Sequence, residues 1–305
     1  MSASTARTKP ISFAELSDFF RQVGGYYEMG NDELDRALLQ WNLLDEASRQ
    51  DQQIAWSFLR WSLTASFLQL MNALEWFASG VLLRRSSYLP AQTMQSYYYS
   101  IFFSYGSFLA IHGKGHYTVG IERDKANEPK AIRRELWLDQ GPPPLICLKE
   151  KGPGGEHEVR ANWFYQVFRS WDMRASYPAV QLFENDAKFH TGFRNMFTYQ
   201  LSEMAEELHH DDTYDPISDE ILLRLWNHDS EMVDYFPEEF WPLAHFKAAF
   251  DTHCKLVDEF GGATPFTHVQ EYLLRALISR HRATGLAEVF TEITKPLLAR
   301  VRDAG

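Results

Sequence analysis

The chain has 305 residues, enough for one large domain or two ordinary ones, and 45% hydrophobic with 15% aromatic residues excludes a wholly disordered protein. The net charge of −11 argues against a broad basic surface for duplex DNA or an anionic membrane, although it is compatible with a local basic pocket. The two cysteines, Cys147 and Cys254, indicate neither a disulfide framework nor a zinc site, so a reducing cytoplasm is expected.

Helix signals dominate the first third of the chain. Residues 12–24, which begin with a Ser-x-x-Glu capping box, and residues 31–44 are predicted to form helices. A long helix is expected over residues 51–85, followed by another over residues 90–112. The apolar parts of these two helices are interrupted by polar residues or shorter than the ~20 residues that cross a bilayer, so we expect no membrane span.

The aromatic residues of these two long helices have two interpretations. Tyr97 to Phe108 could stack on nucleic-acid bases, but they surround the whole helix, which favours a central core helix. We expect Trp56, Trp61 and Trp76 to be core residues as well.

The middle of the sequence loses the helical period. Glu135-Leu-Trp-Leu, residues 145–149 and residues 157–160 are short β-like runs, and Gly152-Pro-Gly-Gly resembles a turn between the last two. This pattern predicts a small β-hairpin insertion around residues 113–160. Its basic residues Lys149, Lys151 and Arg160 could touch a phosphate backbone, but an exposed hairpin of mixed charge is the simpler interpretation.

Helices are expected to resume after the insertion and to continue to the C-terminus, over residues 163–171, 178–208, 218 onward, 237–260, 267–282 and 286–302. The predicted fold is therefore mainly α: a multi-helix bundle with a small β-hairpin insertion. We expect residues 51–213 to form the core, with the helices of residues 1–50 and 214–305 packed on it as one compact unit.

A stripe at helical spacing runs through the helix expected over residues 178–208. Two consecutive positions of this stripe, His190 and Arg194, are not apolar, while the other seven are Val180, Phe183, Ala187, Phe197, Leu201, Met204 and Leu208. A buried guanidinium must be paired or meet water, so a polar pocket is expected. The alternative is an inter-helix salt bridge from Arg194, with His190 packed as a core residue.

The stretch Arg194-Asn195-x-x-x-Tyr199 resembles the Arg-x4-6-His signature of HEPN domains, whose common form is Arg-Asn-x-x-x-His. The aromatic-rich segment from Arg85 to Phe103 is similar to the helix that precedes the motif in that family. The resemblance implies a helical bundle, often dimeric, that acts either as a metal-independent ribonuclease or as an inactive partner in toxin–antitoxin and phage-defence systems. It also implies that Arg194 would hold the scissile phosphate and that Asn195 would orient it.

Position 199 departs from the family pattern, because a tyrosine stands where the family has histidine. A phenol with an unperturbed pKa near ~10 is a poor general base at neutral pH. We therefore expect a catalytically degenerate protein that acts as a binding or scaffold subunit. The alternatives are a metal-independent RNA endonuclease that uses Arg194 with His190 or Tyr199, and a structural helical protein without an active site.

Two further clusters have simple interpretations. In Leu208-His-His-Asp-Asp, neighbouring side chains of a helix point ~100° apart and rarely converge on one ion, so no metal site is expected. Arg275 and Arg280-His281-Arg282 are expected to form a solvated helix face. No cofactor is expected. The candidate partners are a second copy of the chain, another protein or RNA.

Overall fold

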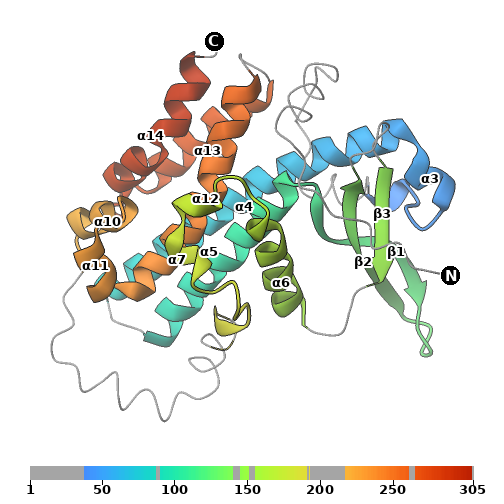
Figure 1. Ribbon diagram of the computed structural model, residues 1–305, viewed down its shortest axis with the longest axis horizontal. Helices are drawn as coiled ribbons and strands as arrows, with labels where there is room; N and C mark the ends of the chain where they lie inside the picture. Colours follow the sequence, from blue (N-terminus) through green and yellow to red (C-terminus); the bar gives the residue numbers. More distant parts are fainter. Residues whose placement is uncertain are drawn as a thin grey trace.

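The computed structural model describes residues 38–86, 90–139, 145–150, 155–190, 192, 217–260 and 265–303. These residues are mainly helical, with one small antiparallel sheet (Figure 1). The elements are α3 (Glu46–Gln50), α4 (Gln52–Ser86), α5 (Pro90–Ile111), β1 (Lys114–Arg123), β2 (Pro129–Asp139), β3 (Leu145–Glu150), α6 (Glu156–Arg169), η1 (Arg174–Ser176), α7 (Pro178–Gln181), α10 (Asp219–Trp226), α11 (Ser230–Tyr235), α12 (Pro237–Phe260), α13 (Pro265–Arg280) and α14 (Ala287–Asp303). The helix expected over residues 12–24 lies outside this described part.

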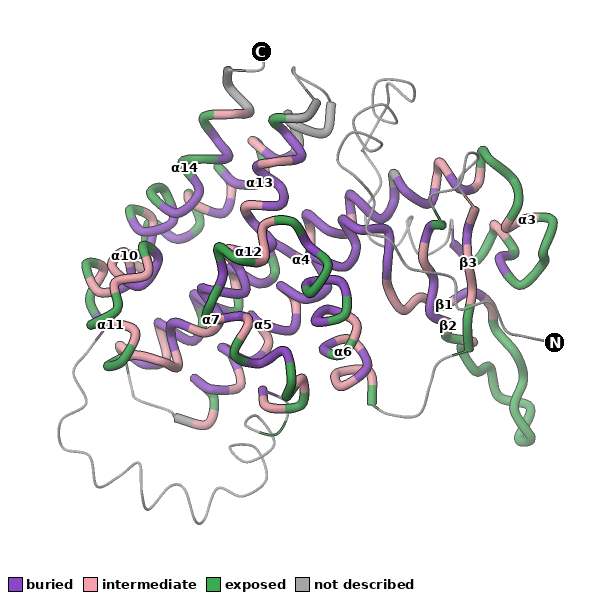
Figure 2. The backbone as a smooth tube through the Cα atoms, in the orientation of Figure 1, coloured by how far each residue is buried: buried purple, intermediate pink, exposed green. Residues whose placement is uncertain are grey.

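Helices α4 and α5 form an antiparallel pair at the centre of the molecule, with α6 and α12 packed on α5. The sheet lies at one end of this pair, and α10, α11, α13 and α14 lie at the other (Figure 1). Buried positions are concentrated in the central helices, whereas the tip of the β1–β2 hairpin is exposed (Figure 2). None of the described helices is long and apolar enough to cross a membrane.

Helix α5 is central because it has no charged residue to turn toward water. Five of its aromatic residues are buried, as predicted: Tyr97, Tyr98, Phe102, Tyr105 and Phe108. Tyr99 and Phe103 are only partly buried, so the prediction that all of them lie in the core was wrong for these two. Trp61 is also buried, but Trp76 is 37% exposed, so its assignment to the core was wrong.

The sheet has the order β1-β2-β3, and both pairings are antiparallel. The insertion was predicted, but the strand assigned to residues 157–160 was wrong, because these residues lie in α6. Glu156 and Glu158 stand in the first turn of α6, where carboxylates interact favourably with the helix dipole. The β-like run of residues 157–160 is only four residues long. That is too short to distinguish the two-residue side-chain period of a strand from the 3.6-residue period of an α-helix.

The helix expected over residues 178–208 is not continuous. Helix α7 ends at Gln181, and turns occupy residues 182–185. Glu184 is buried, and its carboxylate binds Arg174 through hydrogen bonds of 2.5 and 2.9 Å, which fixes this turn. Asn185 and Asp186 follow, and such residues favour turns over helix interiors.

The close approach of α4 and α5 depends on Gly80, because a methyl group there would overlap the buried ring of Tyr97. We predict that Gly80→Ala destabilises the protein by about 1–2 kcal/mol, since overpacking outweighs the gain in helix propensity. Urea unfolding measures the change. Ser86→Ala, at the exposed last residue of α4, is the control and should change stability by less than about 0.5 kcal/mol. A Gly80→Ala variant as stable as Ser86→Ala would contradict this packing.

Candidate functional site

Of the four candidate residues, only His190 lies in the described part of the chain. Arg194, Asn195 and Tyr199 lie outside it, as do the histidines and aspartates at 209–212. The juxtaposition of His190 with Arg194 therefore stays a prediction.

His190 lies in an aromatic cluster, and only 3% of the residue is exposed. Its ring centroid is 4.4 Å from that of Phe183, 5.2 Å from Phe189, 5.8 Å from Trp241 and 5.1 Å from His245. Burial, together with the nearby His245, holds the pKa of His190 well below its usual value. His190 is therefore a neutral imidazole, and its Nε2 has no hydrogen-bond partner among the residues that the structure describes.

The cavity beside His190 is small. Its volume is about 10 Å³, enough for about one water molecule. It is lined by Met94, Tyr97, Tyr98, Ile101, His190, Glu238 and Trp241. A phosphodiester does not fit this space, so in the described part of the chain His190 packs as a core residue.

A second buried histidine, His245 on α12, connects three elements. Its Nδ1 lies 2.8 Å from the carbonyl of Trp241, which must accept, so Nδ1 carries the proton. Its Nε2 lies 3.1 Å from the Tyr165 hydroxyl, which lies 3.1 Å from the Tyr105 hydroxyl. Burial lowers the pKa of His245 to about 4 and raises the pKa of both tyrosines. This network stabilises the packing of α5, α6 and α12.

His253 of α12 and Ser66 of α4 form a pair of the kind that activates a serine nucleophile in enzymes. The Ser66 hydroxyl lies 3.0 Å from His253 Nε2, but it also lies 2.6 Å from the carbonyl of Ser107, to which it donates. Both residues of the pair are completely buried, and burial lowers the pKa of His253 to about 3. No substrate reaches this pair, so its role is structural.

The junction between the sheet and α6 holds a charged network. Glu156 binds Arg133 at 2.7 Å and Arg160 at 3.1 Å, and the guanidinium of Arg160 lies 3.9 Å above the ring of Phe102. The expectation that Arg160 lies on an exposed hairpin was wrong, because it lies on α6 and its side chain is only 14% exposed. Pairing with Glu156 neutralises one of the two positive charges of Arg133 and Arg160 and so weakens their attraction for a phosphate.

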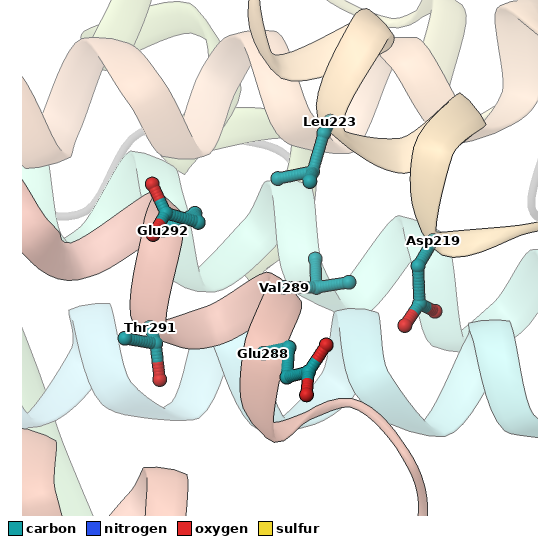
Figure 3. Close-up of a pocket in the computed structure, with 6 residues that line it drawn as sticks. All are labelled: Asp219, Leu223, Glu288, Val289, Thr291 and Glu292. Atoms are coloured by element: carbon teal, nitrogen blue, oxygen red, sulfur yellow. The ribbon is translucent and has the colours of Figure 1, made fainter.

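A pocket of about 300 Å³ lies between α10 and α14 (Figure 3). It is lined by Asp219, Leu223, Glu288, Val289, Thr291 and Glu292. Asp219 binds Arg85 at 2.6 Å, and Glu292 binds Lys295 at 3.2 Å. Asp219 and Glu288 lie in the first turns of their helices, where the helix dipole accounts for acidic residues. The acidic lining disfavours nucleic-acid phosphates.

Arg275 and Arg280 are exposed and paired, whereas His281 is buried beside Glu75, so its assignment to a solvated helix face was wrong. Arg275 binds Glu271 at 2.6 Å, and Arg280 binds Glu75 at 2.9 Å. The described residues include no group of three or more His, Cys, Asp or Glu side chains placed to hold a metal ion.

One face of the α4–α5 pair has no charged residue. We call it the neutral face and define it by partly or fully exposed residues at helical spacing: Ala65, Leu68, Asn72, Trp76, Ser79 and Leu83 of α4, with Gln92, Gln95, Tyr99 and Phe103 of α5. The rings of Trp76 and Tyr99 meet across the two helices at 4.8 Å. Sequence reasoning treated these aromatic residues as core only. The exposure of Trp76 depends on which neighbours cover α4, and helical spacing alone does not reveal that.

The buried histidines predict a loss of stability in acid. The folded-state pKa is about 4 for His112 and His245 and about 3 for His253, against about 6.5 in an unfolded chain. As pH falls, the unfolded chain takes up protons first, so the free energy of unfolding decreases from pH 6.5 to pH 4. Each of His112 and His245 contributes about 3 kcal/mol to this decrease.

Urea unfolding between pH 7 and pH 4 measures the effect. Comparing the wild type with His245→Gln isolates the contribution of His245 to the change in the free energy of unfolding. The carboxylates that also titrate between pH 7 and pH 4 are the same in the wild type and the variant. The decrease should be smaller in His245→Gln than in the wild type by about 3 kcal/mol. Equal decreases in the two proteins would show that His245 is not buried as a neutral ring.

Comparison with known proteins gives this chain no family name. No family model matches the sequence, and neither a curated protein nor a solved structure is significantly similar to it.

Proposed function

We propose that the protein is a HEPN-like binding or scaffold protein without catalytic activity, which works by pairing with a second copy of itself in a prokaryotic defence or toxin–antitoxin-like assembly. The neutral face of α4 and α5 is the observation that supports the binding role. The family and the type of assembly rest on the resemblance carried by Arg194 and Asn195.

Charge supports a second copy as the occupant of the neutral face. A chain with a net charge of −11 repels its own copies wherever charged faces meet. On the neutral face this repulsion is weakest, because none of the ten residues that define it carries a charge. Trp76 is 37% exposed and supported by Tyr99, which is the arrangement of an aromatic anchor in a protein interface.

The environment of His190 argues against the endonuclease alternative. Attack by a 2′-hydroxyl requires a base within hydrogen-bond reach of the substrate. His190 is enclosed by aromatic rings beside a cavity the size of about one water molecule. That leaves Tyr199, which is a poor base at neutral pH unless its pKa is strongly lowered.

The charges argue against RNA as the main partner. The largest pocket described above has three carboxylates in its lining, and Arg133 and Arg160 share Glu156. A phosphate backbone is bound by unpaired basic side chains. The purely structural alternative offers no reason for an exposed tryptophan on an uncharged helix face.

Self-association provides one prediction. The wild-type protein should dimerise, and Trp76→Ala should weaken the dimer at least tenfold, because a central aromatic anchor contributes more than about 1.4 kcal/mol. Sedimentation equilibrium measures both dissociation constants. Tyr272→Ala removes a 71% exposed aromatic ring from α13, a helix that supplies none of the residues of the neutral face, and should leave the dimer unchanged. A monomeric wild type at about 100 µM would contradict pairing with a second copy.

The absence of catalysis provides another prediction. With EDTA present, the wild-type protein should not cleave structured or unstructured RNA, and neither should Arg194→Ala or His190→Ala. Gel analysis of labelled RNA measures cleavage, and circular dichroism confirms that each variant is folded. Cleavage by the wild type that Arg194→Ala abolishes would overturn the non-catalytic proposal and favour the endonuclease.

A further inference from the structure

The cavity beside His190 combines a very small volume with two kinds of polar group. Its volume is about 10 Å³, so its occupant must be about the size of a water molecule. His190 contributes an imidazole to the lining, and Glu238 of α12 contributes a carboxylate. Tyr97 and Tyr98 of α5 and Trp241 of α12 contribute aromatic rings.

His190 brings to this lining a buried nitrogen that the described residues leave unpaired. Only 3% of the residue is exposed, and its Nε2 has no hydrogen-bond partner among the residues that the structure describes. The ring is neutral, and a neutral imidazole has one donor and one acceptor nitrogen. With the proton on Nδ1, Nε2 is an acceptor. Buried polar atoms are rarely left without a partner, so a donor is expected in the cavity.

Glu238 adds a negative charge that no described residue neutralises. It is half-buried, and none of the ion pairs among the described residues includes it. The next residue, Glu239, is buried and forms an ion pair with Arg84 of α4. Two carboxylates are therefore matched by one guanidinium, and the cavity beside Glu238 favours a cation over a neutral occupant.

The aromatic residues of the lining strengthen this preference. The Tyr98 hydroxyl lies 2.6 Å from His157 Nδ1, and Tyr97 interacts with the carboxylate of Glu239, so both hydroxyls already have partners. The faces of aromatic rings attract cations. The cavity therefore offers its occupant a carboxylate, an imidazole nitrogen and aromatic rings, all of which favour a positively charged hydrogen-bond donor.

We propose that this cavity binds one ammonium ion. Ammonium is similar in size to water, and every one of its hydrogens is a donor. It donates to Nε2 of His190 and to the carboxylate of Glu238, and its remaining hydrogens face the aromatic rings. A water molecule of the same size has no charge to match that of Glu238. Hard metal cations prefer a shell of oxygen ligands, which a single carboxylate beside an imidazole does not supply.

NMR of the full-length protein with carbon-13 at Cε1 of its histidines tests the proposal. The signal of His190 is assigned by its absence from the spectrum of His190→Gln. Ammonium chloride then replaces sodium chloride stepwise at neutral pH and constant ionic strength, and potassium chloride replaces it in a parallel titration. The His190 signal should shift saturably with ammonium, because the ion binds its ring, and should not shift saturably with potassium.

Two matched variants separate specific binding from a general salt effect. Glu238→Gln removes the charge but keeps the size of the side chain, and should weaken ammonium binding at least tenfold. Glu220→Gln removes the charge of an exposed carboxylate on α10 that does not line the cavity, and should leave the dissociation constant unchanged. Thermal unfolding gives a second readout that needs no assignment: ammonium should raise the Tm of the wild type and of Glu220→Gln more than that of Glu238→Gln.

Three outcomes would overturn the proposal. The first is the absence of both a saturable shift and a rise in Tm with ammonium, which would mean that the cavity holds water only. The second is potassium binding as tight as that of ammonium, which would assign the site to a metal cation. The third is equal ammonium affinity in Glu238→Gln and Glu220→Gln.

Discussion

The absence of charge in α5 is the constraint on which the rest of the structure depends. Its 22 residues include no Asp, Glu, Lys or Arg, so no face of this helix is suited to full exposure. Helix α4 covers one side, α12 and α6 cover others, and the buried residues form one hydrophobic cluster. The strip that these helices leave uncovered is the neutral face.

Polar groups inside this core are bound in a few histidine-centred networks and in a buried ion pair between Arg84 of α4 and Glu239 of α12. His245 joins α12 to Tyr165 of α6 and Tyr105 of α5, and His253 joins α12 to Ser66 of α4. Both histidines are neutral because burial penalises their charged form. These rings resemble catalytic groups in type, but their closed surroundings make them structural.

The sequence predicted the elements whose pattern is long and uniform. The α4–α5 pair followed from long helical periods, and a small β insertion followed from the loss of that period after Gly113, although strand β1 was not predicted. The break after Gln181 was missed because the spacing of Val180, Phe183 and His190 continues through it, and all three residues are buried as a stripe would require. The turn depends on the long-range pairing of Glu184 with Arg174, which spacing alone does not reveal. Exposure of Trp76 likewise depends on which neighbours cover α4.

Radical footprinting at increasing protein concentration tests most directly the claim that the neutral face binds a second copy. The oxidation rates of Trp76 and Tyr99 should fall together as the concentration passes the dissociation constant, because their contacting rings lie on the neutral face. Tyr235 and Tyr272, which are 73% and 71% exposed elsewhere on the molecule, should react at constant rates. Constant oxidation of Trp76 through a measured transition from monomer to dimer would contradict the account.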